Sequence, residues 1–584
     1  MKLKRILLIP LLSAALFTAV QLAADSKVTP VHASDALFAP DRLIQVEVRM
    51  APEDWQALRI SHRVTGEDFS QVADNPYQYY RADVTIDGQK LNAVGIRKKG
   101  FFGSAISTRP SLKLKLDRYV EDQAFSGLST LTFNNNNQDA SRMQSFVVYR
   151  FMNDAGANSP RANFARIIVN GEDLGIYTHV ESVDKALIKR LFKKAKGDLW
   201  EGYAGDFTEA DFNRIVHKMG KDDNSETLQE LYDLLQSPDP IPLEAVGQLI
   251  DIDAFITLWA SEVLIGHWDG YASNRNNYYM YREPKSGLFY FIPWGPDSAF
   301  WDPGPFLPAG LPKSFKARGY LCQRLWELPE VRSRYRNEMQ RLLNDVWNEK
   351  QMLADLQQAG SLIQPFSTAS VEAAQRNIGS IRKFISGRRG EVQAELDAPA
   401  VDWPETETKG VAGPKPAMEV VGRFSSVYSI PEGEPSQEPA SDDGLSLFAN
   451  VSANLIGTGM ANIEFTVEGV TYKPFTNYGV RTTPGDPDFI RKGYPVIELI
   501  ASADSDHPPW RLTLTMDPHQ LSEGKNSLPI DHFTVWALMS QGEPGAPDAK
   551  TTAFGISGEL ELDSFSRTAG AKVSGQFRLR TSAF

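Results

Sequence analysis

The stretch IGHWDGYASNRNNYYMY, residues 265–281, places His267, Asp269 and Asn274 between two apolar runs. Asp and Asn are poor formers of helices and strands, so a packed core gains little from them here. A carboxylate within hydrogen-bond reach of a hydroxyl can take its proton, and an amide oxygen can hold Mg²⁺ without adding negative charge. The alternative is that these residues only form a turn, which is the commoner role of Asp and Asn in loops.

The spacing of these three residues, H-x-D-x-x-x-x-N, is also that of the protein-kinase catalytic loop. Such a site needs a second carboxylate at the end of a later strand, where it chelates the metal ion that bridges the phosphates. The apolar run LFYFIPW, residues 288–294, is followed by GPDSAF, which places Asp297 at such an exit. The alternative role of Asp297 is that of a helix N-cap or a turn residue.

A glycine-containing turn upstream offers groups that bind phosphate. The stretch GIRKKGFFGSAISTRPSLKLKLD, residues 95–117, predicts two strands joined by this turn, with Lys113 and Lys115 alternating on the second strand. Backbone amides in such a turn can approach phosphate oxygens, and a lysine on a strand can neutralise them. An ordinary hairpin with a solvated lysine face is the alternative.

Four blocks of the sequence carry a family resemblance. They are IRKKGFFGSAISTRPSLKLKLD (96–117), FNNNNQDASRMQSFVVYRFMNDAG (133–156), RIIVNGEDLGIYTHVESVDK (166–185), and HWDGYASNRNNYYMY (267–281) with FIPWGPDSAF (291–300). On these blocks, residues 41–395 resemble the CotH kinase family, the spore-coat protein H type of atypical protein kinases. The blocks look like the family's glycine-rich stretch, Asn-rich helix start, Asn-Gly hairpin, and catalytic loop with metal segment.

The resemblance implies transfer of the γ-phosphate of ATP to Ser or Thr of envelope or extracellular proteins, with Mg²⁺ or Mn²⁺ as cofactor. It implies that Asp269 is the catalytic base and Asp297 a metal ligand. Asn277 matches the family's metal-binding Asn better, whereas Asn274 fits the generic spacing, so both stay candidates.

The resemblance also implies a nucleotide-binding set. The candidates are Arg97, Lys99 and Ser104 in the turn, Lys113 and Lys115 on the strand, and Glu181. Lys113 and Lys115 are the two candidates for the phosphate-binding lysine. Asp139 and Arg142 also fall on family motif positions, without an assigned role.

Gly295 departs from the family pattern, which usually has an Asp directly after Pro-Trp. If that first Asp is the obligatory metal ligand, the chain is a catalytically impaired pseudokinase, and a surface-, matrix-binding or adhesion role on the same fold is the alternative function. If Asp297 is the ligand, activity survives.

The predicted fold class is α+β, a bilobal atypical protein-kinase-like fold with an appended all-β C-terminal domain. Alternating strands form hairpins at Asp87-Gly88 and Asn170-Gly171, and a helix capped by Asp139 or Ser141 ends at Gly156. The predicted parts are a signal peptide (1–33), a β-rich N-lobe (34–184), a helical C-lobe (185–398), a Pro- and Glu-rich linker (399–445) with a strand near MEVVGRF, and an all-β accessory domain (446–584).

The net charge and the N-terminal sequence bear on the binding partners and on the cellular compartment of the protein. The formal net charge of −12 argues against nucleic acid as the main partner. The basic start MKLKR, a long apolar stretch and small residues before cuts at Ala33 or Ala24 predict a cleaved signal peptide, with an uncleaved anchor as the alternative. We therefore expect a secreted or periplasmic protein without a membrane span after cleavage. The single cysteine, Cys322, excludes an internal disulfide and predicts a buried apolar side chain.

The accessory domain says least about function. A glycan or matrix ligand is one expectation for it, with Trp510, Phe533 and Trp536 as a sugar-stacking surface. Aromatic side chains in a small β domain are more often part of its core, which is the alternative.

Overall fold

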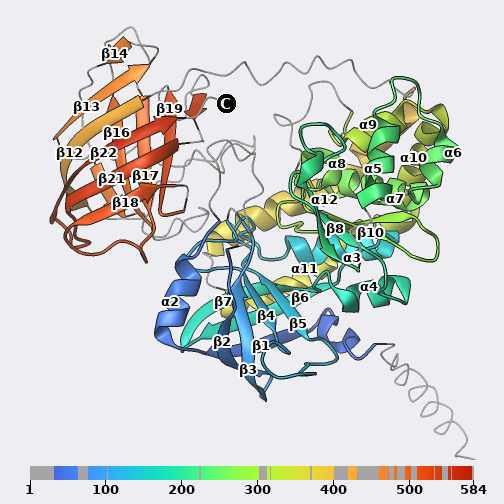
Figure 1. Cartoon of the computed structure of the whole chain (residues 1–584), viewed down its shortest axis with the longest axis horizontal. Coiled ribbons are helices and arrows are strands. Elements are labelled where there is room, and N and C mark those ends of the chain that lie inside the picture. Colours follow the sequence, from blue (N-terminus) through green and yellow to red (C-terminus); the bar gives the residue numbers. More distant parts are fainter. Residues whose placement is uncertain are drawn as a thin grey trace, which may run out of the picture.

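The computed structural model describes residues 32–581 except 64–75, 102, 222–224, 302–311, 316, 368–370, 400–418, 430–459, 468–469, 473–478, 483–493, 502–509, 532, 542–549 and 554–555. Three sheets organise the chain: a closed barrel, a four-stranded sheet among helices, and an eleven-stranded sheet (Figure 1). The architecture is therefore mixed α and β. We call these parts the barrel unit, the helical unit and the C-terminal β unit.

The barrel unit has the strand order β1-β2-β3-β4-β5-β7-β6 and closes through the parallel pair β1–β6. Its elements are η1 (Asp35–Phe38), β1 (Leu43–Arg49), α2 (Pro52–Ile60), β2 (Tyr80–Ile86), β3 (Gln89–Lys98), β4 (Leu112–Lys115), β5 (Thr130–Asn134), α3 (Gln144–Ala155), β6 (Ala162–Val169) and β7 (Glu172–Val180). Strand β1 alternates buried and exposed side chains, which is why its sequence predicts a strand with one face on a core. The hairpins turn at Asp87-Gly88 and Asn170-Gly171, which confirms both predicted turns.

Helix α3 corrects one expectation. It begins at Gln144, and its N-cap position is Met143, without a capping side chain. Asp139 and Ser141 nevertheless serve this end of the helix, because Asp139 accepts the N–H of Gln144 (2.8 Å) and Ser141 accepts that of Met143 (3.1 Å). The predicted end at Gly156 is confirmed, with a left-handed backbone there.

The helical unit surrounds a sheet of order β11-β10-β8-β9. Its elements are α4 (Lys185–Phe192), β8 (Leu199–Gly202), η2 (Phe212–Arg214), β9 (Ile215–Met219), α5 (Ser225–Leu235), α6 (Leu243–Gly247), α7 (Ile252–Ile265), α8 (Tyr271–Asn274), β10 (Tyr278–Arg282), β11 (Phe289–Pro293), α9 (Tyr320–Trp326), α10 (Pro329–Arg341), η4 (Leu342–Val346), α11 (Glu349–Ile363), η5 (Gln364–Phe366) and α12 (Val371–Asp397). Helix α7 is buried along most of its length and packs against α10 and β11. Cys322 on α9 is fully buried, as its apolar surroundings predict.

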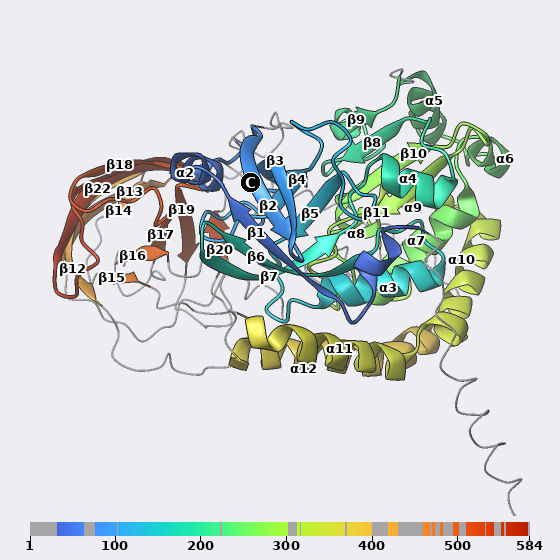
Figure 2. The same ribbon diagram turned by 90° about the horizontal axis from the view of Figure 1, so that it is seen from below.

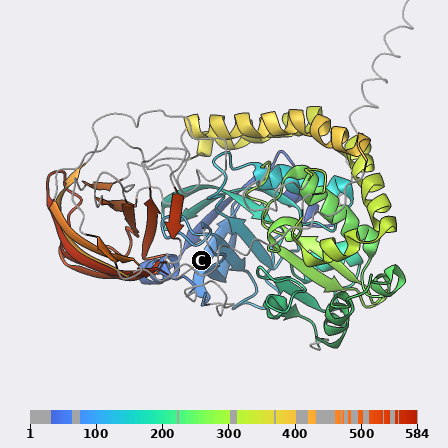
Figure 3. The same cartoon turned by 90° about the horizontal axis from the view of Figure 1, so that it is seen from above.

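Helices α11 and α12 run side by side along one flank of the molecule (Figures 2 and 3). Helix α3 shares one apolar core with the helical unit, through Phe146 and Phe151 among others. The barrel unit and the helical unit are therefore joined by packed side chains as well as by the chain. Among the described helices, none is long and apolar enough to cross a bilayer. The predicted signal peptide falls on residues 1–33, of which 1–31 lie outside the described part.

The C-terminal β unit closes on itself because β12 pairs with β22 in addition to the main strand order. Its strands are β12 (Glu419–Ser429), β13 (Met460–Val467), β14 (Val470–Tyr472), β15 (Gly479–Thr482), β16 (Pro495–Ala501), β17 (Trp510–Met516), β18 (Asn526–Ile530), β19 (Val535–Gln541), β20 (Lys550–Ala553), β21 (Ile556–Ser564) and β22 (Lys572–Thr581). Strand β12 lies inside the predicted linker 399–445, yet its apolar side chains Val420 and Phe424 belong to the core of this unit. Trp536 is buried, which agrees with the alternative that aromatic residues of this domain belong to its core.

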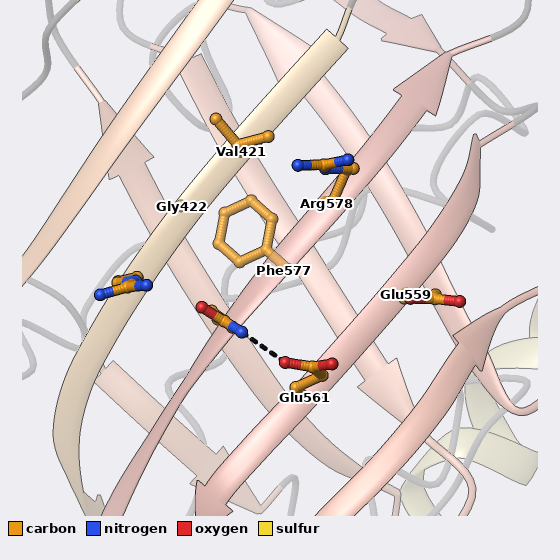
Figure 4. Close-up of a pocket in the computed structure, with 8 residues that line it drawn as sticks. Val421, Gly422, Glu559, Glu561, Phe577 and Arg578 are labelled. Carbon is orange, nitrogen blue, oxygen red and sulfur yellow. Dashed lines mark hydrogen bonds between the residues drawn. The ribbon is translucent and has the colours of Figure 1, made fainter.

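The outer face of β12, β22 and β21 bears a hollow of about 370 Å³ (Figure 4). Arg578 stands opposite Glu559, and Gln576 donates a hydrogen bond to Glu561. Cross-strand pairs of this kind stabilise a solvated sheet face. Phe577, the aromatic residue of the lining, is 4% exposed and belongs to the core below.

Candidate active site

The loop between α7 and β10 holds the carboxylate of Asp269 in a ring of amides. Asn274 and Asn277 donate to its two oxygens at 2.5 and 2.6 Å, and Asn276 donates at 3.3 Å. Burial raises the pKa of Asp269, and the three amide hydrogen bonds oppose that rise. The group of Asn residues seen in the sequence therefore fixes the orientation of one carboxylate.

Glu262, near the end of α7, supports this loop from behind. Its carboxyl group is buried and accepts the backbone N–H groups of Ala272 (2.8 Å) and Tyr271 (3.3 Å). Burial raises the pKa of Glu262 to about 8, because it disfavours the ionised carboxylate. The two backbone hydrogen bonds favour the ionised form and oppose this rise. The start of α8 is thus tied to the helix that precedes the loop.

His267 joins the loop to the segment that carries Asp297. Its Nε2 lies 3.2 Å from the carbonyl oxygen of Trp294, so this nitrogen carries the proton and donates. Burial lowers the pKa of His267 to about 4, which leaves the imidazole neutral at pH 7. A second link runs from Trp268 Nε1 to Ser298 Oγ at 2.7 Å.

Asp297 follows β11, is partly buried, and interacts with the charge of Asp269. Burial raises the pKa of Asp297 to about 7, and the negative charge of Asp269 adds to this rise. The positive charge of Lys99 opposes it. Two carboxylates that repel each other in a partly buried place are the kind of donor set that a divalent cation stabilises.

Lys99, directly after β3, carries a positive charge that interacts with Asp297. Its Nζ donates to Asn134 Oδ1 at 2.5 Å and lies 5.6 Å from the centre of the Trp294 ring. Burial lowers the pKa of Lys99 to about 8, and the charge of Asp297 opposes this effect. A partly buried lysine, two partly buried carboxylates and the amides around them thus form one charged group, which we call the Lys99–Asp297–Asp269 group.

The two strand lysines have different surroundings, although both lie on one face of β4. Lys113 is opposite Arg97 of β3, is partly buried, and interacts with the charges of Asp184 and Glu201. Burial, followed by the positive charge of Arg97, lowers its pKa. Lys115 instead pairs with Asp117 at 2.8 Å and is 37% exposed. The structure therefore brings Lys113, but not Lys115, toward Lys99.

The turn after Lys99 is closed by its own backbone. Ser104 accepts the N–H of Ser111 (2.8 Å) through its carbonyl, and Lys99 donates its N–H to Ser111 (3.0 Å). At Gly100, where φ is +90°, a Cβ would lie 2.3 Å from the Cβ of Ser104, so this position requires glycine. Ser104 thus lies in the turn, but its hydroxyl makes no described bond to the Lys99–Asp297–Asp269 group.

Glu181 lies in a different network. Its carboxylate pairs with Arg161 (2.8 Å) and Arg190 (2.7 Å) and is 2% exposed. Its pKa is lowered because these arginines outweigh the effect of burial. This bidentate network ties β7 to α4 and to the start of β6, so Glu181 acts there as a structural anchor.

The two candidate metal-binding amides, Asn274 and Asn277, both donate N–H groups to Asp269. These bonds do not use their oxygens, so metal binding by either amide stays a prediction. Gly295 lies beside Asn277: its φ is +54°, and a Cβ there would be 3.0 Å from the Asn277 carboxamide. Among the described residues, no three His, Cys, Asp or Glu side chains form a metal cluster. Mg²⁺ is commonly held by one or two carboxylates together with substrate phosphates, and the pair Asp297 and Asp269 fits that donor set.

Four site residues were not singled out from the sequence: Asn134, Glu201, Glu262 and Asn276. Asn276 and Asn134 belong to Asn-rich runs, so residue type was a usable signal. Glu201 interacts with the charges of both Lys99 and Lys113 and accepts hydrogen bonds from Tyr203 and Tyr279. No local pattern marks Glu201 or Glu262, because their roles depend on packing between distant segments.

Comparison with known proteins places this geometry in a family. The family model described as CotH kinase protein matches residues 96–391, half of the chain. The inner spore coat protein H of Bacillus subtilis (strain 168) is 24% identical over 294 residues, which are 46% of this chain and 79% of that protein. The inner spore coat protein H-like protein of the same organism is 25% identical over 257 residues, 42% of this chain and 74% of that protein.

Two solved structures show a weaker likeness. The Helicobacter pylori proinflammatory kinase CtkA has a TM-score of 0.28 and 12% identity, over 52% of this chain and 96% of that one. The Shewanella oneidensis MR-1 toxin–antitoxin complex of HipA, HipB and operator DNA contains a chain with a TM-score of 0.28 and 15% identity, over 50% and 66%. A TM-score this low does not establish a shared fold. The family match covers all four predicted site blocks from Arg97 to Asp297, and the chain belongs to the CotH kinase protein family.

Proposed function

We propose that this protein is an exported, ATP- and metal-dependent protein kinase that transfers the γ-phosphate of ATP to Ser or Thr of envelope or extracellular proteins. In this proposal the barrel unit and the helical unit are the two lobes of a kinase-like fold, with the active site between them. The observation that carries it is the partly buried Lys99–Asp297–Asp269 group, whose charges interact. Family membership supports the kinase class.

Each side chain of the group has a role in the proposal. Asp269 is the base that takes the proton of the acceptor hydroxyl, and its amide ring holds it in one orientation. Asp297 holds Mg²⁺ or Mn²⁺, with an oxygen of Asn277 or Asn274 as a further donor. The metal, when bound, neutralises the phosphates of ATP. Lys99 supplies a second positive charge, and Lys113 with Arg97 extends it along β3 and β4.

Phosphate transfer from radiolabelled ATP tests this proposal directly. With Mg²⁺ or Mn²⁺ and a Ser- and Thr-containing acceptor, we expect transfer by the wild type and a loss of about 10²-fold or more in Asp269→Ala, because one proton acceptor is removed. Asp173→Ala is a matched control, since that carboxylate forms an exposed pair with Arg166. Equal transfer by the wild type and Asp269→Ala would contradict the role of Asp269.

The second candidate function is a catalytically impaired surface- or matrix-binding protein on the same fold. Gly295 favours it, because the family pattern has an Asp there. A glycan or matrix ligand of the C-terminal β unit is part of this second proposal. A thermal-shift titration separates the two candidates: a rise in Tm with millimolar ATP and Mg²⁺ supports the kinase, and an unchanged Tm supports the impaired form.

A further inference from the structure

The C-terminal β unit touches the barrel unit at the turn that follows Lys99. In Figure 2, α2 of the barrel unit lies next to the strands of the C-terminal β unit. Gln56 on α2 donates to the carbonyl of His519 at 3.0 Å, and the ring of His62 stacks on Phe533 with centres 4.9 Å apart. Phe101 of the turn approaches the same ring, with centres 5.9 Å apart. The aromatic residue Phe533 thus takes part in the contact between the two units.

Ser107 is the centre of the contact and is held on every polar atom. The hydroxyl of Tyr494 accepts the Ser107 N–H at 3.1 Å, and Asp517 accepts the Ser107 hydroxyl at 2.5 Å. From the barrel side, Arg59 donates to the Ser107 carbonyl at 3.0 Å. Ser107, Tyr494 and Asp517 are 2%, 1% and 4% exposed, so these bonds are shielded from water.

The contact is closely packed. A void of about 20 Å³ between Ser107, Tyr494 and Asp517 has room for about one water molecule. Asp517 is itself fixed, because it also accepts the N–H of His519 (2.9 Å) and the amide of Gln520 (3.1 Å). Its negative charge faces the buried ammonium of Lys98, the residue before Lys99.

We propose that Tyr494 and Asp517 are positioning residues for the nucleotide site: by holding Ser107 they fix the turn 100–111, whose first residue follows Lys99. The proposal rests on the kinase function proposed above. Ser107 is linked to the site through the turn itself, because Gly103 accepts from Asn135 (3.0 Å) and Ser111 accepts from the backbone N–H of Lys99 (3.0 Å). A turn of this length without tertiary bonds samples many conformations, and each ordered residue costs conformational entropy when a phosphate binds.

The test uses the full chain and four variants. Tyr494→Phe removes one hydroxyl, Asp517→Ala removes the acceptor and the charge, and Asp517→Asn keeps an acceptor oxygen without the charge. Gln56→Ala is the matched control, because it removes a bond between the same two units that does not touch the turn. The readouts are hydrogen exchange of residues 103–111 without nucleotide, and the KM for ATP and kcat with Mg²⁺.

We expect exchange in residues 103–111 to rise at least about fivefold in Tyr494→Phe and Asp517→Ala, because a buried hydrogen bond is lost. The KM for ATP should rise about threefold or more with kcat changed less than about twofold, since the catalytic loop is untouched. Asp517→Asn should restore most of both values, and Gln56→Ala should change neither. A Tyr494→Phe protein with wild-type exchange and wild-type KM would overturn the proposal, whether or not Asp517→Ala folds.

The two proposals fail in different ways. In one outcome, exchange of residues 103–111 rises in Tyr494→Phe, but the wild type neither transfers phosphate nor binds ATP. This would confirm that Tyr494 orders the turn and would contradict both the kinase function and the positioning role for nucleotide. If the wild type is an active kinase but the exchange of residues 103–111 is the same in all variants, the kinase function stands and the positioning role falls.

Discussion

The acidic and the cationic sides of the candidate active site are held in different ways. Asp269 is bound by amides that lie within eight residues of it, and the loop rests on Glu262 of the preceding helix. The turn after Lys99 is instead held by Arg59 from α2 and by Tyr494 and Asp517, which follow Ser107 by 387 and 410 residues. The acidic side thus depends mainly on local sequence, whereas the cationic side depends on the assembly of the whole molecule.

The largest effect that tests this contrast should come from the lysines. Lys99→Met should lower kcat/KM for phosphate transfer about 10²-fold, because a partly buried charge that interacts with Asp297 is lost. Lys115→Met is the matched control on the neighbouring strand and should stay within about twofold, since Lys115 is itself exposed and pairs with a partly exposed Asp117. A larger loss in Lys115→Met than in Lys99→Met would reverse the assignment.

On the acidic side, Glu262→Gln should destabilise the protein by about 1–3 kcal/mol, because the new amide NH₂ would face a backbone N–H donor. Thermal unfolding measures this. Glu349→Gln removes a partly exposed pair with Arg389 and should cost no more than about 1 kcal/mol. If the two variants have equal Tm values, the support of the loop by Glu262 is not what keeps the acidic side in place.

Asp297 gives the acidic side a pH signature in the metal-free protein. Its pKa is raised to about 7 in the folded state, so between about pH 4 and 7 the folded chain binds more protons than the unfolded chain. Its contribution to stability therefore falls as pH rises through this window. We expect the Tm of Asp297→Asn to gain at least about 2 °C on wild type between pH 5 and 7.5. A difference in Tm that stays constant with pH would contradict a partly buried, proton-binding Asp297.

The smallest effect concerns His62, on the cationic side. Burial opposes its charge, but the hydrogen bond and charge of Asp531 (3.3 Å) raise its pKa, while the nearby Lys98 acts against this. The pair therefore stabilises the contact below the ordinary histidine pKa, and this is lost as pH rises through the raised value. Exchange of residues 103–111 should grow by up to about fivefold between pH 5.5 and 8 in the wild type, relative to His62→Gln. An identical pH dependence in both proteins would exclude this pair as a contributor.

The same contrast explains which parts could be predicted from the sequence. The two hairpins and the end of α3 follow from short periodic patterns and local turn residues, and the structure has them at the predicted positions, whereas α3 begins at Gln144, later than its predicted caps. The sequence did not decide which lysine is the better candidate for binding phosphate. Alternation places Lys113 and Lys115 on one face of β4 but does not say what surrounds each of them. The role of Ser107 could not be predicted from the sequence. Its partners Tyr494 and Asp517 lie far along the chain, and no local pattern indicates that this part contacts the turn.

The pairing of β12 with β22 has a consequence for the order of events during folding. Glu419 and Arg580 are cross-strand partners, although more than 150 residues separate them in the chain. Contacts between such distant residues form slowly, because a long loop must close first. The loop around Asp269 can form early, because its hydrogen bonds join residues close in the chain. Ser107 can bind Tyr494 and Asp517 only after the C-terminal strands have folded. An incompletely folded chain would therefore have its acid groups in place but a loose turn after Lys99. If the proposed kinase function holds, activity would appear only once the C-terminal β unit has folded.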